Sequence, residues 1–277
     1  MALDAGAAVE SVYVAPEGRS SRSVAAVVDR AFDAGVRVFD LGPGVIERVA
    51  DTVSPQPVLA VVGFSPEALD VTRRLSMVAV LVDVRDPGNA GTIIRTADAA
   101  GIGAVIHCDG SVDPTNPKTV RASAGSIFHV RVVSGGDAAA VVEKLKSWEF
   151  VTVGTTVRGG VDYAGFDWRQ RVALVLGNEA SGLDEELLGR LDHRVSIPMV
   201  GRAESLNVGV SASVLCFEAL RQRRTAGDPA PRSTISDMDA PARVPGEPTG
   251  PGDGVALEAG PEAPGGGPDG GHGGGRG

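Results

Sequence analysis

The chain has 277 residues, enough for one or two domains. It carries 26 basic and 35 acidic residues, a net charge of −9, which argues against a protein that binds nucleic acid through bulk positive charge. Two cysteines are too few for a disulfide framework or a zinc cage, and no apolar run approaches the roughly 20 residues that cross a bilayer. The first residues lack the basic and apolar segments of a signal peptide. We therefore expect a cytoplasmic protein with no membrane partner.

The first part of the chain alternates short apolar runs with helical patterns. We expect a small α/β module over residues 1–66, followed by a linker at 67–76. Its expected strands and helices, in chain order, are strand 11–15, helix 23–35, strand 36–42, helix 45–51 and strand 57–64.

A second α/β domain is expected over residues 77–224. Its apolar runs are nearly continuous, which is typical of parallel strands covered by helices on both faces. The strands are expected at 78–84, 104–108, 150–156 and 172–177, and the helices at 89–101, 117–127, 136–148, 183–191 and 205–224.

The composition changes at residue 225. Of the 53 residues from 225 to 277, 15 are glycine and 9 are proline, and few are large and apolar. Such a segment buries too little surface to offset the entropy of ordering. We expect a disordered, acidic tail.

Three segments hold polar residues where an expected strand meets a helix, the place where open α/β sheets bind ligands. In the first, Asn89 suits a helix N-cap and Arg95 follows inside the helix. In the second, glycines including Gly177 would let a ligand approach the backbone. In the third, Ser205 and Asn207 open the last helix. Ordinary turns, helix caps and a surface arginine explain each segment equally well when it is taken alone.

The order and spacing of these segments resemble the SpoU/TrmH family of RNA ribose 2′-O-methyltransferases, within the SPOUT class. The motif N-x-G-x-x-x-R-T appears as Asn89, Gly91, Arg95 and Thr96. The motif L-G-N-E-x-x-G-L spans 176–183. The sequences I-P-M and S-L-N-V occupy 197–199 and 205–208, and the match is good over 78–133 and 172–224.

The first module is similar to the family's substrate-binding domain, which is related to a small ribosomal protein. The sequence at 48–62 is close to the usual end of that domain. The chain begins about where the domain's first helix should finish. Either the start codon is misassigned, or the domain is shortened and lacks its first strand and most of a helix.

The resemblance implies a C-terminal trefoil knot and S-adenosylmethionine as cofactor, with S-adenosylhomocysteine as product and no metal. It also implies a homodimer in which the final helix lies in the interface and the substrate site is shared. The expected cofactor contacts, mostly through the backbone, are Thr155, Gly177, Ile197, Met199 and Leu206.

The resemblance also assigns roles at the reacting centre. Arg95 would stabilise negative charge on the ribose 2′-oxygen, because a guanidinium holds its proton too tightly to be an easy base. Asn89 and Glu179 would orient Arg95 and the RNA, while Ser205 and Asn207 would organise the site. The basic residues expected to bind RNA are Arg85, Lys118, Arg121, Arg158 and Arg202.

Ribosomal RNA is the favoured substrate, and transfer RNA is the alternative. Two other readings stay open: methylation of a base nitrogen, and a non-catalytic knotted RNA-binding or ribosome-assembly factor. A dinucleotide-dependent oxidoreductase is disfavoured, because no G-x-G-x-x-G motif opens a helix after a strand.

Overall fold

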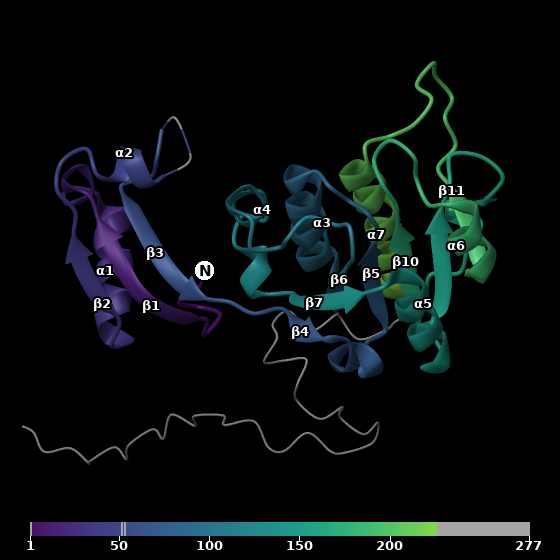
Figure 1. The fold of residues 1–277 in the computed structure, drawn as a ribbon, viewed down its shortest axis with the longest axis horizontal. Coiled ribbons are helices and arrows are strands. Elements are labelled where there is room, and N and C mark those ends of the chain that lie inside the picture. Colours follow the sequence, from purple (N-terminus) through teal and green to yellow (C-terminus); the bar gives the residue numbers. More distant parts are fainter. Residues whose placement is uncertain (1, 51, 53, 226–277) are drawn as a thin grey trace, which may run out of the picture. The chain divides into compact units, whose positions relative to one another are not determined.

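The computed structural model describes residues 2–50, 52 and 54–225. The segment expected to be a disordered tail lies outside them, except for Thr225, which ends the last helix. The described residues form two separate sheets (Figure 1).

The smaller sheet has the order β2-β1-β3. Strand β1 (Ala8–Val14) runs parallel to β2 (Arg37–Asp40) and antiparallel to β3 (Val58–Gly63). Helix α1 (Arg22–Asp33) is amphipathic and buries Val24 and Ala31 together with Val12 and Val14 of β1. Helix α2 is shorter than expected and spans Ile46–Val49.

The larger sheet is parallel throughout, as the apolar runs predicted, with the order β4-β7-β6-β5-β10-β8-β11-β9. Strands β5 and β10 lie side by side, with Met77 opposite Val172 and Leu81 opposite Leu176. In chain order the strands are β4 (Glu67–Ala68), β5 (Met77–Leu81), β6 (Ala104–Cys108), β7 (Arg131–Gly136), β8 (Val151–Thr155), β9 (Val161–Asp162), β10 (Val172–Leu176) and β11 (His193–Ser196).

Helices cover both faces of this sheet (Figure 1). Alternate residues of β5 point to opposite faces: Met77, Ala79 and Leu81 join the core under α3 (Pro87–Ala100) and α7 (Val208–Thr225). Val78 and Val80 join the core under α5 (Ala138–Ser147) and α6 (Glu185–Arg190). All five residues of β5 are buried, which explains the continuous apolar run.

The segment expected to be a linker, 67–76, is ordered against the larger sheet. Strand β4 pairs with β7, and a 3₁₀ helix follows at Leu69–Arg74. The Arg171 guanidinium donates hydrogen bonds to the carbonyls of Leu75, Arg73 and Trp148, and it lies 4.4 Å from the centre of the Phe150 ring. These contacts join residues far apart in the chain, so local sequence pattern does not reveal them.

Expected boundaries of other helices were also wrong. Asn89 does not cap α3: Pro87 occupies the first turn, and the carboxylate of Asp86 accepts a hydrogen bond from the Asn89 N–H at 2.9 Å. The last helix begins at Val208 rather than at 205, because Asn207 caps it by accepting from the Gly209 N–H. Helix α4 (Pro117–Ala122) ends early, since residues 124 and 125 have positive φ.

Among the described residues, the structure contains no helix with the length and apolar character needed to cross a membrane.

Candidate active site

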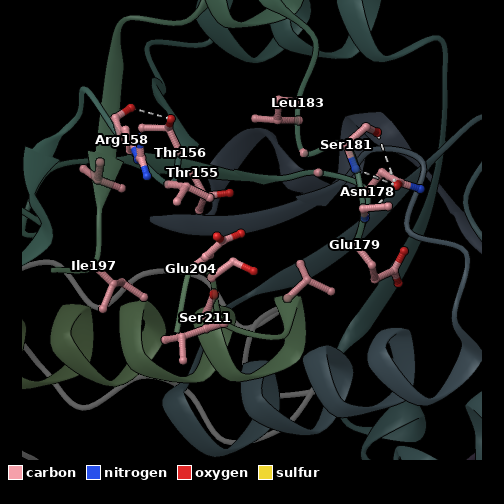
Figure 2. A pocket seen from close by; sticks show the side chains of 18 of the residues that line it. Thr155, Thr156, Arg158, Asn178, Glu179, Ser181, Leu183, Ile197, Glu204 and Ser211 are labelled. Atoms are coloured by element: carbon pink, nitrogen blue, oxygen red, sulfur yellow. Dashed lines mark hydrogen bonds between the residues drawn. The ribbon is translucent and has the colours of Figure 1, made fainter. Parts of the chain in front are cut away.

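A cavity of about 470 Å³ lies where β8, β10 and β11 end and α7 begins (Figure 2). The carboxyl ends of parallel strands are the usual ligand-binding edge of such a sheet, and the volume is in the range of small-molecule sites. All five residues expected to contact the cofactor line this cavity: Thr155, Gly177, Ile197, Met199 and Leu206.

The loop after β10 is tightly closed on itself. Asn178 and Gly182 exchange backbone hydrogen bonds of 3.1 and 2.9 Å, and Gly182 has a φ of +71°. A Cβ added to Gly177 would lie 2.5 Å from the carbonyl carbon of Gly182. The fold of this loop therefore requires glycine at position 177, whether or not a ligand binds.

The side chain of Asn178 joins this loop to the end of β5. Its amide donates to the Asp83 carbonyl at 2.9 Å and to the Asp83 carboxylate at 3.2 Å. Asp83 has a φ of 55°, a conformation rare for residues other than glycine. Asn178 also accepts a hydrogen bond from the Ala180 N–H. Neither Asp83 nor Asn178 was expected to have a role, although Asn178 lies within the motif at 176–183.

A chain of hydrogen bonds joins three of the expected catalytic residues. The Asn207 side-chain amide donates to the Asn89 Oδ1 at 2.8 Å, and the Asn89 amide donates to the Glu179 carboxylate at 2.9 Å. Glu179 also accepts from the N–H groups of Asp86 at 3.2 Å and Arg85 at 3.4 Å. Asn89, Glu179 and Asn207 thereby fix the first turn of α3 beside the cavity.

These contacts set the charge of Glu179. Partial burial would raise the pKa of its carboxyl group, but hydrogen bonds from Asn89, from its own backbone and from the N–H groups of Asp86 and Arg85 together lower the pKa below the usual 4.5. Glu179 is therefore a carboxylate at neutral pH.

Arg95 lies elsewhere on α3. Its side chain is exposed, it does not line the cavity, and no hydrogen bond or ion pair joins it to another residue in the described part of the chain. On the same helix, Thr96 forms a 2.9 Å hydrogen bond with Ser213 of α7. The structure therefore brings Asn89, Glu179, Ser205 and Asn207 to the cavity region and leaves Arg95 outside the cavity wall.

The expected RNA-binding residues lie in different surroundings. Arg158 lines the cavity, Arg85 pairs with Asp83 at 2.7 Å, and Lys118 lies 3.7 Å from the Asp86 carboxylate. Arg121 and Arg202 are exposed and lie outside the cavity wall.

The cavity suits a ligand that combines apolar and charged groups. Its walls include Leu183, Ile197 and Met199, while Arg158 and Glu204 supply opposite charges. An adenosine joined to an amino acid, as in S-adenosylmethionine, has this character. Within the described ranges, no group of three or more His, Cys, Asp or Glu side chains could hold a metal ion.

Comparison with known proteins identifies the family. The family model described as "SpoU rRNA Methylase family" matches residues 76–217, about half of the chain. The chain belongs to this family. The matched region contains β5 to β11, α3 to α6 and most of α7, and so it includes the cavity and the hydrogen-bond chain.

The names of two relatives of this SpoU chain state the reaction that each relative catalyses. The chain is 38% identical over 186 residues to the 23S rRNA (guanosine(2553)-2′-O)-methyltransferase RlmP of Bacillus subtilis, an alignment covering 67% of this chain and 73% of RlmP. It is 40% identical to the 23S rRNA (uridine(2479)-2′-O)-methyltransferase of Streptomyces viridochromogenes, covering 64% of this chain and 65% of that protein. The chain thus spans slightly less than two thirds of the second relative.

A solved structure supports the same family assignment. The SpoU methyltransferase AviRb of Streptomyces viridochromogenes, in complex with the cofactor AdoMet (S-adenosylmethionine), matches with a TM-score of 0.70 and 31% identity, over 81% of this chain and 87% of AviRb. The expected family, its ribose 2′-O-methylation of RNA and its cofactor are thereby confirmed. The roles of individual residues stay predictions.

Proposed function

We propose that this SpoU chain transfers the methyl group of S-adenosylmethionine to a ribose 2′-hydroxyl of 23S ribosomal RNA. The observation that carries the proposal is the hydrogen-bond chain from Asn207 through Asn89 to Glu179, which joins motif residues from three segments beside the cavity. The two relatives with named reactions support ribosomal RNA over transfer RNA.

The chain's own residues position the reactants in this proposal. When bound, S-adenosylmethionine supplies an electrophilic methyl group. Thr155, Gly177, Ile197, Met199 and Leu206, which all line the cavity, would hold it there.

Arg95 stabilises the negative charge that develops on the ribose oxygen as the hydroxyl loses its proton. Its guanidinium is exposed and forms no hydrogen bond or ion pair to the rest of the described chain, so it is available to a substrate. Asn89 and Glu179 hold the first turn of the helix that carries Arg95.

We further propose a homodimer through α7, with a substrate site completed by the second copy. Val210 and Phe217 are each 48% exposed although both are large and apolar, and their spacing places them on one face of α7 together with Val214. The position of Arg95 outside its own chain's cavity wall supports a shared site, because a second copy would then bring an arginine to this cavity.

We propose that the C-terminal region forms a trefoil knot and that residues 1–66 form an RNA-binding domain, distinct from the domain at 77–224, whose sheet also includes strand β4. The knot is what the motif resemblance to the SpoU/TrmH family implies, and the match to the SpoU family model over residues 76–217 supports that resemblance. The separate three-stranded sheet supports the domain division.

The test is methyl transfer from radiolabelled S-adenosylmethionine to unmodified 23S rRNA and, separately, to transfer RNA. Label on a ribose 2′-oxygen of 23S rRNA is the expected result. We expect Arg95→Ala to lose at least about a hundredfold in rate while its affinity for S-adenosylmethionine stays within twofold. Arg190→Ala, an exposed residue of α6 outside the cavity wall, is the matched control for loss of one positive charge and should keep full activity.

Each other result contradicts the proposal. Label only in transfer RNA would favour the alternative substrate, and label on a base would favour nitrogen methylation. Cofactor binding without label in either RNA would favour a non-catalytic RNA-binding factor. Equal loss of cofactor affinity in Arg95→Ala would remove Arg95 from its assigned role.

A further inference from the structure

Four charged side chains line the cavity, and two of them already have partners. Glu179 accepts hydrogen bonds from Asn89 and from the loop before α3, and Glu185 lies 3.3 Å from Arg194. Glu204 and Arg158 form no side-chain hydrogen bond or ion pair with any residue that the structure describes. One unpartnered negative charge and one unpartnered positive charge thus face the same cavity.

The two residues come from different loops. Arg158 follows β8, and Glu204 lies in the loop between β11 and α7, immediately before Ser205 and Leu206, which also line the cavity. Figure 2 shows the Glu204 carboxylate pointing into the cavity and Arg158 at its margin beside Thr156. A ligand that carries both an ammonium group and a carboxylate would offer a partner to each of these two side chains.

We propose that Glu204 and Arg158 bind the amino-acid end of S-adenosylmethionine, with the Glu204 carboxylate accepting from the α-ammonium group and the Arg158 guanidinium donating to the α-carboxylate. The proposal rests on the proposed function, since it names the groups that recognise the methyl donor. A planar guanidinium suits a carboxylate because it can donate two parallel hydrogen bonds.

The α-ammonium group is a better partner for Glu204 than the sulfonium group. Methyl transfer removes the positive charge from the sulfur, so a carboxylate beside the sulfur would stabilise the reactant more than the transition state and slow the reaction. The α-ammonium keeps its charge throughout, and an anion beside it strengthens binding without opposing the reaction.

Arg158 was expected from the sequence to bind RNA. Its position in the cavity wall favours cofactor binding instead. Its place in the wall with Thr155, Gly177 and Ile197 puts it next to the expected cofactor contacts. The test must therefore measure cofactor affinity in the absence of RNA.

The experiment is calorimetric titration of the full chain with S-adenosylmethionine, S-adenosylhomocysteine and 5′-methylthioadenosine. The last compound has no amino-acid group. Glu204→Gln and Arg158→Gln should each weaken binding of the first two ligands by about tenfold, as expected for an exposed charge-assisted hydrogen bond, and leave binding of the third unchanged. Glu186→Gln is the matched control, because it removes a carboxylate that pairs with Arg190 and does not line the cavity, and its affinities should stay within twofold.

Three outcomes would overturn the proposal. If Glu204→Gln weakened only S-adenosylmethionine, the carboxylate would face the sulfonium group. If either variant weakened all three ligands equally, the side chain would shape the loop instead of binding the amino-acid end. If Arg158→Gln left all three affinities unchanged and lowered only RNA binding, Arg158 would belong to the RNA site. Failure of methyl transfer with these affinity changes intact would refute the proposed function alone.

Discussion

Replacing Gly91 with alanine is expected to destabilise the protein, although alanine is the better helix former. Gly91 lies inside α3, where α4 packs against it. A Cβ at this position would lie 2.5 Å from the Cβ of Ala122, 2.6 Å from the Thr119 carbonyl oxygen and 2.9 Å from the Ser123 backbone nitrogen. Two of these atoms belong to the backbone, so α4 must move away as a unit.

The expected magnitude follows from two opposing effects. Alanine gains about 1 kcal/mol over glycine in a helix interior. Overpacking of a close interface costs about 1–3 kcal/mol, and the backbone contacts at Gly91 place the cost at the upper end. The free energy of unfolding should therefore fall by about 2 kcal/mol.

The assay is equilibrium unfolding in urea, followed by tryptophan fluorescence. Both tryptophans, Trp148 and Trp168, are buried against the larger sheet and report on its packing. The midpoint should move to lower urea at an unchanged slope, since the surface exposed on unfolding stays the same.

For a matched control variant, the change in the free energy of unfolding should have the opposite sign. Gly189 is exposed on α6, and a Cβ there would have no heavy atom within 4 Å. Gly189→Ala should stabilise the protein by about 0.5–1 kcal/mol. If Gly91→Ala stabilised the protein as Gly189→Ala does, the inference that α3 and α4 require a glycine at their contact would be refuted.

Three further outcomes are expected. Arg171→Lys should lower the free energy of unfolding by about 1–3 kcal/mol, because lysine cannot reach three carbonyls and stack on Phe150 at once; a urea midpoint equal to that of the wild type would contradict this. The pKa of Glu179 is lower in the folded than in the unfolded protein, so its contribution to stability is complete above about pH 4.5 and is lost as the pH falls through the folded pKa. The difference in free energy of unfolding between wild type and Glu179→Gln should therefore shrink below about pH 5. A difference that stayed constant with pH would disprove this. Phe217→Asp should convert a dimer to a monomer in sedimentation velocity, whereas a wild-type monomer would refute the α7 interface.

The parallel sheet could be predicted because its central strands are buried on both faces. Met77–Leu81 and Val172–Leu176 contain only apolar residues, and every one is buried. Strand β7 was missed because it begins with Arg131 and ends in Ser-Gly-Gly, so its apolar run is too short to stand out. Strands β4 and β9 have two residues each, below the length at which an alternating pattern can be recognised.

The hydrogen bonds of the site could not be derived from the sequence. The motifs identified Asn89, Glu179 and Asn207, but the bonds between them join residues 90 and 118 positions apart. Only the strand order, with β5 beside β10, brings those loops together. Glu204 was missed because the family motif begins at Ser205, one residue later.

The position of Glu179 should weaken the binding of phosphate groups at the start of α3. Backbone N–H groups at the start of a helix ordinarily attract phosphate or sulfate from solution. Here the N–H groups of Arg85 and Asp86, just before α3, already donate to the Glu179 carboxylate, and the Asn89 N–H donates to Asp86. The chain thus carries its own counter-anion at this position. Inorganic phosphate should compete poorly there, and nucleotide inhibitors should gain little by adding a phosphate aimed at the start of α3.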